Sequence, residues 1–161
     1  MSAQYDALIN TPFGAIAISA HGSQLAIELL TDSPSPQNQT TSHPQVAKAY
    51  TQITQYLERS LKRFDVAYPP GGTAYQQKVW QAIASIPFGE TRTYGQLARM
   101  IGSGPRAVAN ACGANMLPVV IPCHRVVAQN GLGGFMQSKE DGLRVKKWLL
   151  AHEGIDISRY E

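Results

Sequence analysis

Three adjacent side chains at the end of an apolar run are of the types that perform nucleophilic chemistry. Residues 116–121 are apolar and partly β-branched, which predicts a buried strand. Pro122 interrupts this strand, and Cys123, His124 and Arg125 follow it directly. The thiolate form of cysteine is a nucleophile, and a neighbouring base or cation favours its formation. The pattern therefore indicates a reactive Cys123, with a small buried structural cysteine as the alternative.

Glu153 is a second candidate, because it lies where a helix disfavours an anion. The last predicted helix begins near Ser138, which can form a cap with Asp141, and it ends at Gly154. At the carboxyl end of this helix the macrodipole disfavours a negative charge by about 0.3–1 kcal/mol. A residue that breaks a local rule is a functional candidate. The alternative is a solvated surface glutamate.

The elements that must position these residues divide into two lobes. Short apolar segments separated by turn residues predict an antiparallel meander, and a helix follows from Pro44. Pro69-Pro70-Gly71-Gly72 then marks a boundary. We therefore expect an α+β fold with a scaffold domain at 1–72 and a mainly helical domain at 73–161. The strands expected in the first lobe are residues 5–10, 15–20, 24–30 and 64–68, with a polar loop at 31–42.

Two Thr-x-x-Gln pairs predict helix starts in the second lobe, at Thr73 and at Thr93. Gly102 ends the second of these helices, and Pro105 begins another in its first turn. Two short helices joined by a glycine-containing turn are typical of a helix-turn-helix. A plain helical hairpin is the alternative.

The helix after Pro105 has an outer stripe that is nearly bare. Arg106, Ala109, Asn110 and Gly113 share one stripe at helical spacing. An α-helix is about 10–12 Å wide with its side chains and the minor groove only about 6 Å, so small side chains allow a closer approach to DNA. The pattern favours a helix laid against a minor groove, in which Arg106 pairs with a phosphate or fills the gap left by an extruded base. The residues on the opposite stripe are Ala107, Val108, Ala111 and Cys112.

Composition restricts the class of protein. The chain has 161 residues, 43% apolar and 16% charged, which is typical of a globular protein, and no apolar run reaches the length of a membrane span. Its start lacks a signal-peptide pattern, and two cysteines cannot form a disulfide framework, so we expect a cytoplasmic location. The net charge of +3 is compatible with nucleic acid. His21 and His43 lack cysteine partners, and we expect no metal and no cofactor.

Residues 75–154 resemble the O6-alkylguanine-DNA alkyltransferases, DNA-repair proteins that move an alkyl group from guanine onto their own cysteine. The segments that carry the resemblance are Pro122-Cys123-His124-Arg125-Val126, Pro105-Arg106-Ala107-Val108 and Trp148-Leu149-Leu150-Ala151-His152-Glu153-Gly154. The resemblance implies that Cys123 accepts the alkyl group and that Glu153 orients His124. Neighbours in an extended chain point to opposite faces, so His124 can act on the Cys123 thiol only through a turn at Pro122 or a bridging water. The resemblance implies the water. For the first lobe it implies a ribonuclease H-like fold.

The resemblance implies that a monomer acts on double-stranded DNA in a single-turnover reaction. It also assigns roles to further residues. Tyr94 would give a proton to the guanine ring, Asn115 would brace the active-site turn, and Arg106 would replace the flipped base. Phe135 departs from the family, which often has a tyrosine in that region, and residues 134–140 align poorly. The DNA-contacting candidates are Arg106, Ala107, Ala109, Asn110 and Gly113, and those for the alkylguanine pocket are Tyr94, Met116, Pro118, Val126, Gly134 and Phe135.

Two other functions are compatible with parts of the pattern. A non-enzymatic alkyltransferase-like protein would recognise the lesion without repairing it, but such proteins usually lack the reactive cysteine that stands here at position 123. A cysteine hydrolase or transferase unrelated to DNA would account for Cys123, His124 and Glu153. It would leave the bare helix and Arg106 unexplained.

Overall fold

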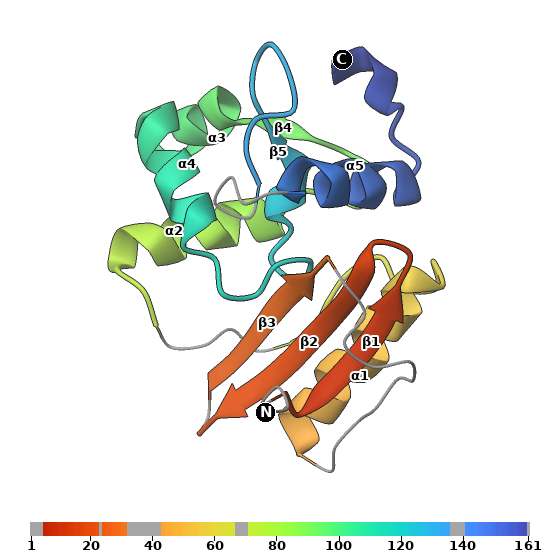
Figure 1. The fold of residues 1–161 in the computed structure, drawn as a ribbon. Coiled ribbons are helices and arrows are strands. Elements are labelled where there is room, and N and C mark those ends of the chain that lie inside the picture. The colour runs from red at the N-terminus through yellow and green to blue at the C-terminus, as the bar shows by residue number, and fades with distance from the viewer. Residues whose placement is uncertain (1–4, 23, 32–42, 67–70, 136–140, 161) are drawn as a thin grey trace. The chain divides into compact units, whose positions relative to one another are not determined.

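A computed structural model describes residues 5–22, 24–31, 43–66, 71–135 and 141–160 of the chain. The fold is mixed, with a small antiparallel sheet and several helices (Figure 1). The chain forms two compact units. One comprises Met1–Pro70 and Met116–Val120, and the other comprises Gly71–Asn115 and Ile121–Glu161. Part of the apolar run before Cys123 thus packs with the amino-terminal unit.

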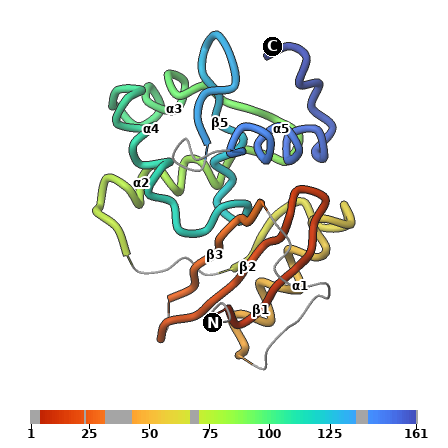
Figure 2. Tube along the Cα trace, viewed as in Figure 1, coloured from red at the N-terminus to blue at the C-terminus, as the bar shows by residue number. Residues whose placement is uncertain are grey.

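The first unit is a three-stranded sheet with one helix along it (Figures 1 and 2). Its strands are β1 (Ala7–Thr11), β2 (Gly14–His21) and β3 (Gln24–Leu30), all antiparallel in the order β1-β2-β3. The helix α1 (Pro44–Leu57) buries one stripe of side chains, as its sequence period predicts. The first three predicted strands are therefore confirmed within two residues at each end. The buried residues of α1 are Val46, Ala49, Ile53 and Tyr56.

The strand expected at residues 64–68 is wrong where it can be checked. Residues 64–66 are irregular, and residues 67 and 68 lie outside the described part of the chain, as do residues 32–42 of the predicted polar loop. Asp65 shows why no strand forms, since its backbone N–H donates to the side chain of Gln52 on α1 at 2.9 Å. A backbone donor engaged in this way is not free for a sheet ladder.

Three helices open the second unit: α2 (Ala74–Ala84), α3 (Tyr94–Ile101) and α4 (Pro105–Gly113). Both predicted capping boxes are present, and each threonine side chain accepts a backbone N–H while the glutamine reaches back to the cap. Gly102 ends α3 in the left-handed conformation at φ 69°, which glycine adopts without strain. Trp80 ties the group together by donating its indole N–H to the Ala111 carbonyl at 2.8 Å.

The predicted strand before Cys123 is wrong. Residues 116–121 are buried at Leu117 and from Val119 to Ile121, but they form turns and isolated bridges. Pro118 and Pro122 provide the physical reason, because proline cannot donate to a sheet ladder. Val119 has a positive φ of 76°, which is incompatible with a strand.

The chain turns directly after Pro122. Cys123–Arg125 form a 3₁₀ helix, η1, and Val126–Val127 form the short strand β5. This strand pairs in parallel with β4 (Arg92–Thr93), with Thr93 opposite Val127. Because Thr93 is also the cap of α3, the pairing fixes the start of that helix beside the segment that follows the cysteine.

The last long helix begins later than predicted. α5 spans Gly142–His152, and its preceding residue Asp141 has a positive φ of 70° and makes no side-chain cap. Ser138, the expected cap, lies outside the described residues. Within α5, Leu143 is 48% exposed, whereas Lys146 is fully buried. A short 3₁₀ helix, η3 (Ile157–Tyr160), follows, and no helix in the described ranges is long and apolar enough to cross a membrane.

Candidate active site

The Cys123 thiol lies in a nearly closed setting. The residue is 6% exposed and starts the 3₁₀ turn η1. The side-chain amide of Asn115 donates to Sγ at 3.2 Å and to the Ile121 carbonyl at 2.9 Å. The Cys123 thiol in turn points its proton at the Cys112 carbonyl, with Sγ 3.8 Å from the oxygen. Asn115 therefore holds both the sulfur and the backbone just before it.

The resting form of this group is the neutral thiol. The neighbouring Cys112 side chain and burial both hold the pKa of the Cys123 thiol well above its usual range. The amide of Asn115 and the charge of Lys146 lower that pKa, but they do not outweigh the first two causes. A standing thiolate does not fit this environment. The nucleophile has to be generated during the reaction.

His124 and Glu153 form a buried pair with Arg125. His124 Nε2 lies 2.6 Å from Glu153 Oε2, and both side chains are fully buried. The Arg125 guanidinium donates to the same carboxylate, from Nε to Oε1 at 2.8 Å and from Nη2 to Oε2 at 3.1 Å. The 3₁₀ turn η1 makes this possible. It lets His124 and Arg125, which are adjacent in the sequence, both contact the Glu153 carboxylate at the end of α5. The Arg125 guanidinium, together with the hydrogen bond to His124, explains why an anion is stable at a helix carboxyl end.

The charges of the pair follow from its surroundings. Burial alone would raise the pKa of Glu153, but hydrogen bonds and charge from His124 and Arg125 lower the pKa of that carboxyl well below its usual range. Burial lowers the pKa of His124, although Glu153 opposes the shift. We therefore assign an ionised carboxylate, balanced by Arg125, next to a neutral imidazole.

The tautomer of His124 then follows from its contacts. Nε2 faces a carboxylate, so it carries the proton and donates it. Nδ1 is left as the acceptor nitrogen, buried and without a hydrogen-bond partner among the described residues. An unpartnered buried nitrogen is costly unless a role or a water accounts for it. Its lone pair is the group that can take up a proton.

Two groups around Glu153 were not found from the sequence. One is Arg125, which the sequence analysis noted only as a cation beside the thiol. The other is Gly89, whose backbone N–H donates to Glu153 Oε1 at 3.0 Å from a position with φ 84°. The turn Pro87-Phe88-Gly89-Glu90 was visible in the sequence, but nothing in it indicated a partner at residue 153.

Tyr94 lies beside the loop that follows β5. Its hydroxyl donates to the Gly134 carbonyl at 3.5 Å, and its ring lies over Gly133, where a Cβ atom would come within 2.9 Å of Cε2. Burial raises the pKa of Tyr94 to about 12, so the phenol keeps its proton at neutral pH. Phe135, the last described residue of this loop, packs its ring edge-on to His124 with centroids 6.5 Å apart. The loop thus connects Tyr94 with the histidine.

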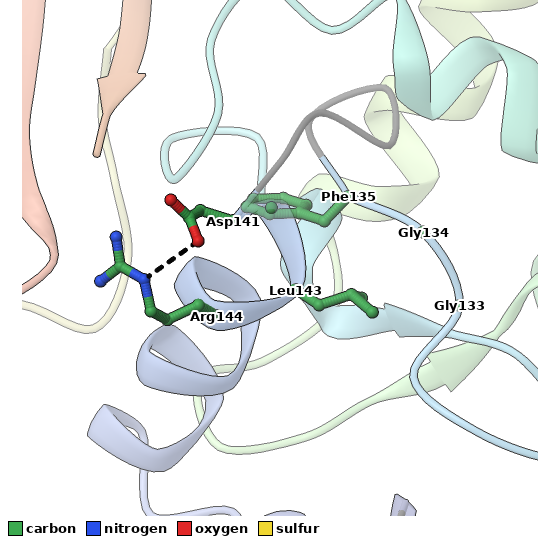
Figure 3. Close-up of a pocket in the computed structure, with 7 residues that line it drawn as sticks. Gly133, Gly134, Phe135, Asp141, Leu143 and Arg144 are labelled. Atoms are coloured by element: carbon green, nitrogen blue, oxygen red, sulfur yellow. Dashed lines mark ion pairs between the residues drawn. The ribbon is translucent and has the colours of Figure 1, made fainter. Parts of the chain in front are cut away.

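The other predicted pocket residues divide between the two units. Val126 is fully buried in β5, whereas Met116 and Pro118 belong to the amino-terminal unit, where the Met116 carbonyl accepts the Ile27 N–H at 2.9 Å. Gly134 and Phe135 line a pocket of about 450 Å³ at the start of α5 (Figure 3). Asp141 and Arg144 face each other across 3.7 Å on its rim. Neither Cys123 nor Tyr94 lines this pocket.

The predicted DNA-contacting residues lie on the outer side of α4. Arg106, Ala107 and Asn110 are exposed, Ala109 and Gly113 are half-buried, and the buried side consists of Val108 and Ala111. Ala107 is thus not on the buried stripe on which the helical period placed it. It lies in the first turn, ahead of the packing contacts of the helix. Within the described ranges, no group of three or more His, Cys, Asp or Glu side chains could hold a metal ion.

A buried cysteine followed in the sequence by a histidine with an acceptor nitrogen is an arrangement found in thiol-dependent proteins. Comparison with known proteins identifies the family. Residues 74–155, about half of the chain, match the family described as 6-O-methylguanine DNA methyltransferase, DNA binding domain. A methylated-DNA–protein-cysteine methyltransferase of Mycobacterium bovis is 36% identical over 148 residues, which cover 86% of this chain and 90% of that protein.

Two further relatives agree. A probable methylated-DNA–protein-cysteine methyltransferase of Acanthamoeba polyphaga mimivirus is 55% identical over 84 residues, covering 51% of this chain and 54% of that protein. The crystal structure of Mycobacterium tuberculosis OGT in complex with DNA aligns with a TM-score of 0.74 at 37% identity, over 94% of this chain and 92% of that one. The chain belongs to the methylated-DNA–protein-cysteine methyltransferase family. Its activity is DNA repair by alkyl transfer to a protein cysteine.

Proposed function

We propose that the acceptor is Sγ of Cys123 and that the substrate is O6-alkylguanine in duplex DNA. The observation that carries this proposal is His124 Nδ1, an unpartnered buried nitrogen in the residue next to the thiol, with the opposite ring nitrogen fixed by Glu153. Such an arrangement is a base held in one tautomer and orientation. The product is a stable thioether, so each molecule acts once.

The first step is removal of the thiol proton. It passes from Sγ of Cys123 to Nδ1 of His124, through a water as the resemblance implies. The imidazolium that forms is stabilised by the Glu153 carboxylate at 2.6 Å. Arg125 remains paired with that carboxylate, and the new positive charge on His124 is balanced by the thiolate that forms on Cys123 in the same transfer.

The second step is an in-line displacement at the alkyl carbon. A bond forms between Sγ and this carbon, the bond from carbon to O6 breaks, and its electron pair remains with guanine. The ring would leave as an anion unless it takes up a proton. Tyr94 supplies that proton, since its phenol is still protonated at neutral pH.

The base must leave the helix before it can react, because the O6 substituent is inaccessible inside the duplex. Extrusion costs a few kcal/mol, and Arg106 fills the vacated space. Helices α3 and α4 act as a helix-turn-helix, with the exposed face of α4 against the minor groove. Arg106, Ala107 and Asn110 are the exposed residues of that face, with only one long side chain among them.

The amino-terminal unit is a scaffold. Its antiparallel sheet and single helix are compatible with a ribonuclease H-like arrangement. The protein acts on DNA as a monomer in the cytoplasm, and several monomers can cluster on one DNA molecule.

The test is an intact-mass measurement after incubation with an oligonucleotide that contains O6-methylguanine. We expect the mass to rise by one methyl group, and peptide mapping to place this group on Cys123. Cys123→Ser should gain none, and Cys112→Ser should gain the methyl as the unchanged chain does. Tight binding without a mass change would favour a lesion-recognition protein instead. Methylation of Cys112 would remove Cys123 from the mechanism.

A further inference from the structure

Lys146 is a fully buried lysine that the mechanism above does not use. It lies in the second turn of α5 and is 0% exposed. Burying an ammonium group is costly unless its donors are satisfied. Its three N–H groups are satisfied by the carbonyls of Val126, Leu132 and Gly134, at 2.7, 2.5 and 3.0 Å. No carboxylate of the described residues forms an ion pair with it, so its charge remains uncompensated.

The three carbonyls belong to one loop. Residues 126–134 leave the cysteine turn through β5 and fold back on themselves through a bridge between Ala128 and Gly131. Lys146 Nζ therefore ties the two ends of this loop to α5. The Gly134 carbonyl also accepts the Tyr94 hydroxyl at 3.5 Å. The ammonium thus positions the loop that accepts the hydrogen bond of Tyr94, the residue proposed to donate the proton.

The charge of Lys146 also acts on the thiol. It lowers the pKa of Cys123, and the two cysteines in turn raise the pKa of Lys146. Burial is the larger influence on the lysine and brings its pKa down to about 8. An apolar residue would fill the same space at lower electrostatic cost. Lys146 Nζ also contacts the Val126 carbonyl directly after the cysteine turn, and titratable groups with shifted pKa values cluster at functional sites.

We propose that Lys146 is a positioning residue of the alkyl transfer: its ammonium clamps loop 126–134 beside the flipped base and supplies the positive charge against which the Cys123 thiolate forms. The inference rests on the proposed function, because it takes Cys123 as the acceptor.

Other titratable groups near α5 also interact with Lys146. Cys112 and Cys123 raise the pKa of Lys146, although burial lowers it more, and Lys146 lowers the pKa of His124. The Glu153 carboxylate is paired with Arg125. Arg159, the charged side chain of η3, is exposed and does not contact the ammonium in the described structure.

The experiment compares Lys146→Met, which removes donors and charge, with Lys146→Gln, which keeps two N–H donors but no charge. Lys147→Met on the same helix is the matched control. Two rates are measured from about pH 6 to about pH 10: carbamidomethylation of Cys123 by iodoacetamide, followed by peptide mass, and transfer from free O6-benzylguanine.

We expect both Lys146 variants to shift the midpoint of Cys123 carbamidomethylation to higher pH. A shift of one pH unit corresponds to about tenfold slower reaction near neutrality. Lys146→Met should transfer the benzyl group from O6-benzylguanine more slowly than Lys146→Gln, because it also loses the hydrogen bonds that clamp the loop. Lys147→Met should react like the unchanged chain. Identical pH profiles in all three variants would overturn the proposal. If the unchanged chain gains no methyl on Cys123, the proposed function itself fails, which is a separate result.

A measurement on the unchanged chain covers the case in which neither Lys146 variant folds. Carbon NMR of the lysine side chains should show Lys146 titrating near pH 8, well below the ordinary range of lysine, because its ammonium is buried among the three carbonyls of the loop. If Lys146 titrated with the exposed lysines, it would not be held in the loop, and the clamp would be contradicted.

Discussion

His124 and Glu153 are 29 residues apart in the sequence, yet their side chains lie 2.6 Å apart with no exposed surface. The contact sets the tautomer of the histidine, and it leaves Nδ1 as the nitrogen that can take the thiol proton. The carboxylate can do this only because Arg125 and the Gly89 N–H bind its oxygens at the same time. The base His124, the orienting carboxylate of Glu153 and the counter-charge of Arg125 therefore form one hydrogen-bonded cluster.

Replacing Glu153 by glutamine should slow alkyl transfer without removing the acceptor. A glutamine side chain no longer stabilises an imidazolium, and the lost proton transfer corresponds to about a 10²–10⁴-fold slower reaction. The rate is measured with free O6-benzylguanine and compared with Glu58→Gln in the first unit, which should react normally. An unchanged rate in Glu153→Gln would show that His124 does not act as the base.

Stability should fall on acidification because of His124. Burial lowers its pKa in the folded state, so its contribution to stability is present above its unfolded pKa of about 6.5 and is lost as the pH falls below that value. The free energy of unfolding should decrease by up to about 1.4 kcal/mol per pH unit between about pH 6.5 and 5, above the range where carboxylates titrate.

Urea unfolding at several pH values measures this slope. His124→Gln should flatten it, whatever its effect on absolute stability, and exchange of the exposed His21 for glutamine should leave it in place. A slope that persists in His124→Gln would assign the pH dependence to another group.

Local signals in the sequence were sufficient for most elements but not for the contacts between them. The two capping boxes, Gly102 and the strands of the first unit are encoded within a few residues, so they are predicted correctly. The apolar run before Cys123 has the composition of a buried strand, but its prolines forbid the ladder. Burial was predicted there, and conformation was not.

The site shows the same limit. Cys123, His124 and Glu153 were identified from residue chemistry and resemblance, because each lies in a recognisable segment. Arg125 and Lys146 have roles that depend on which acceptors the fold places beside them. A lysine in the middle of a helix normally reads as solvent-facing. Only the arrangement of the 126–134 carbonyls makes a buried one stable here.

Cys112→Ala should make Cys123 more reactive in the resting protein. The Cys112 side chain is the largest cause that raises the pKa of the Cys123 thiol, so its removal should lower that pKa and raise the thiolate fraction at neutral pH. Each unit of pKa gives roughly tenfold more thiolate. Iodoacetamide labelling across pH measures the change, and Cys112→Ser, which keeps a hydroxyl, should lie between the two. Slower labelling of Cys112→Ala would contradict the assignment.

Arg106→Ala should separate the handling of DNA from the chemistry. The side chain is exposed on α4 and does not belong to the cysteine site, so transfer from free O6-benzylguanine should stay within about twofold of the unchanged chain. Repair of O6-methylguanine in a duplex should fall by tenfold or more, since a few kcal/mol of extrusion cost would no longer be offset. Arg63→Ala in the first unit controls for loss of one positive charge. Equal losses on both substrates would remove the finger role of Arg106.

Gly133→Ala should impair alkyl transfer by displacing Tyr94. Gly133 has φ 75°, and an added Cβ would lie 2.9 Å from Cε2 and 3.0 Å from the hydroxyl of Tyr94, closer than real contacts allow. Gly22→Ala is the matched control, because Gly22 has φ 66° but nothing within 4 Å of the added atom. Both variants should lose about 1 kcal/mol of stability from the left-handed backbone. Only Gly133→Ala should react more slowly with O6-benzylguanine, and an equal rate in the two would show that the position of Tyr94 does not limit the transfer.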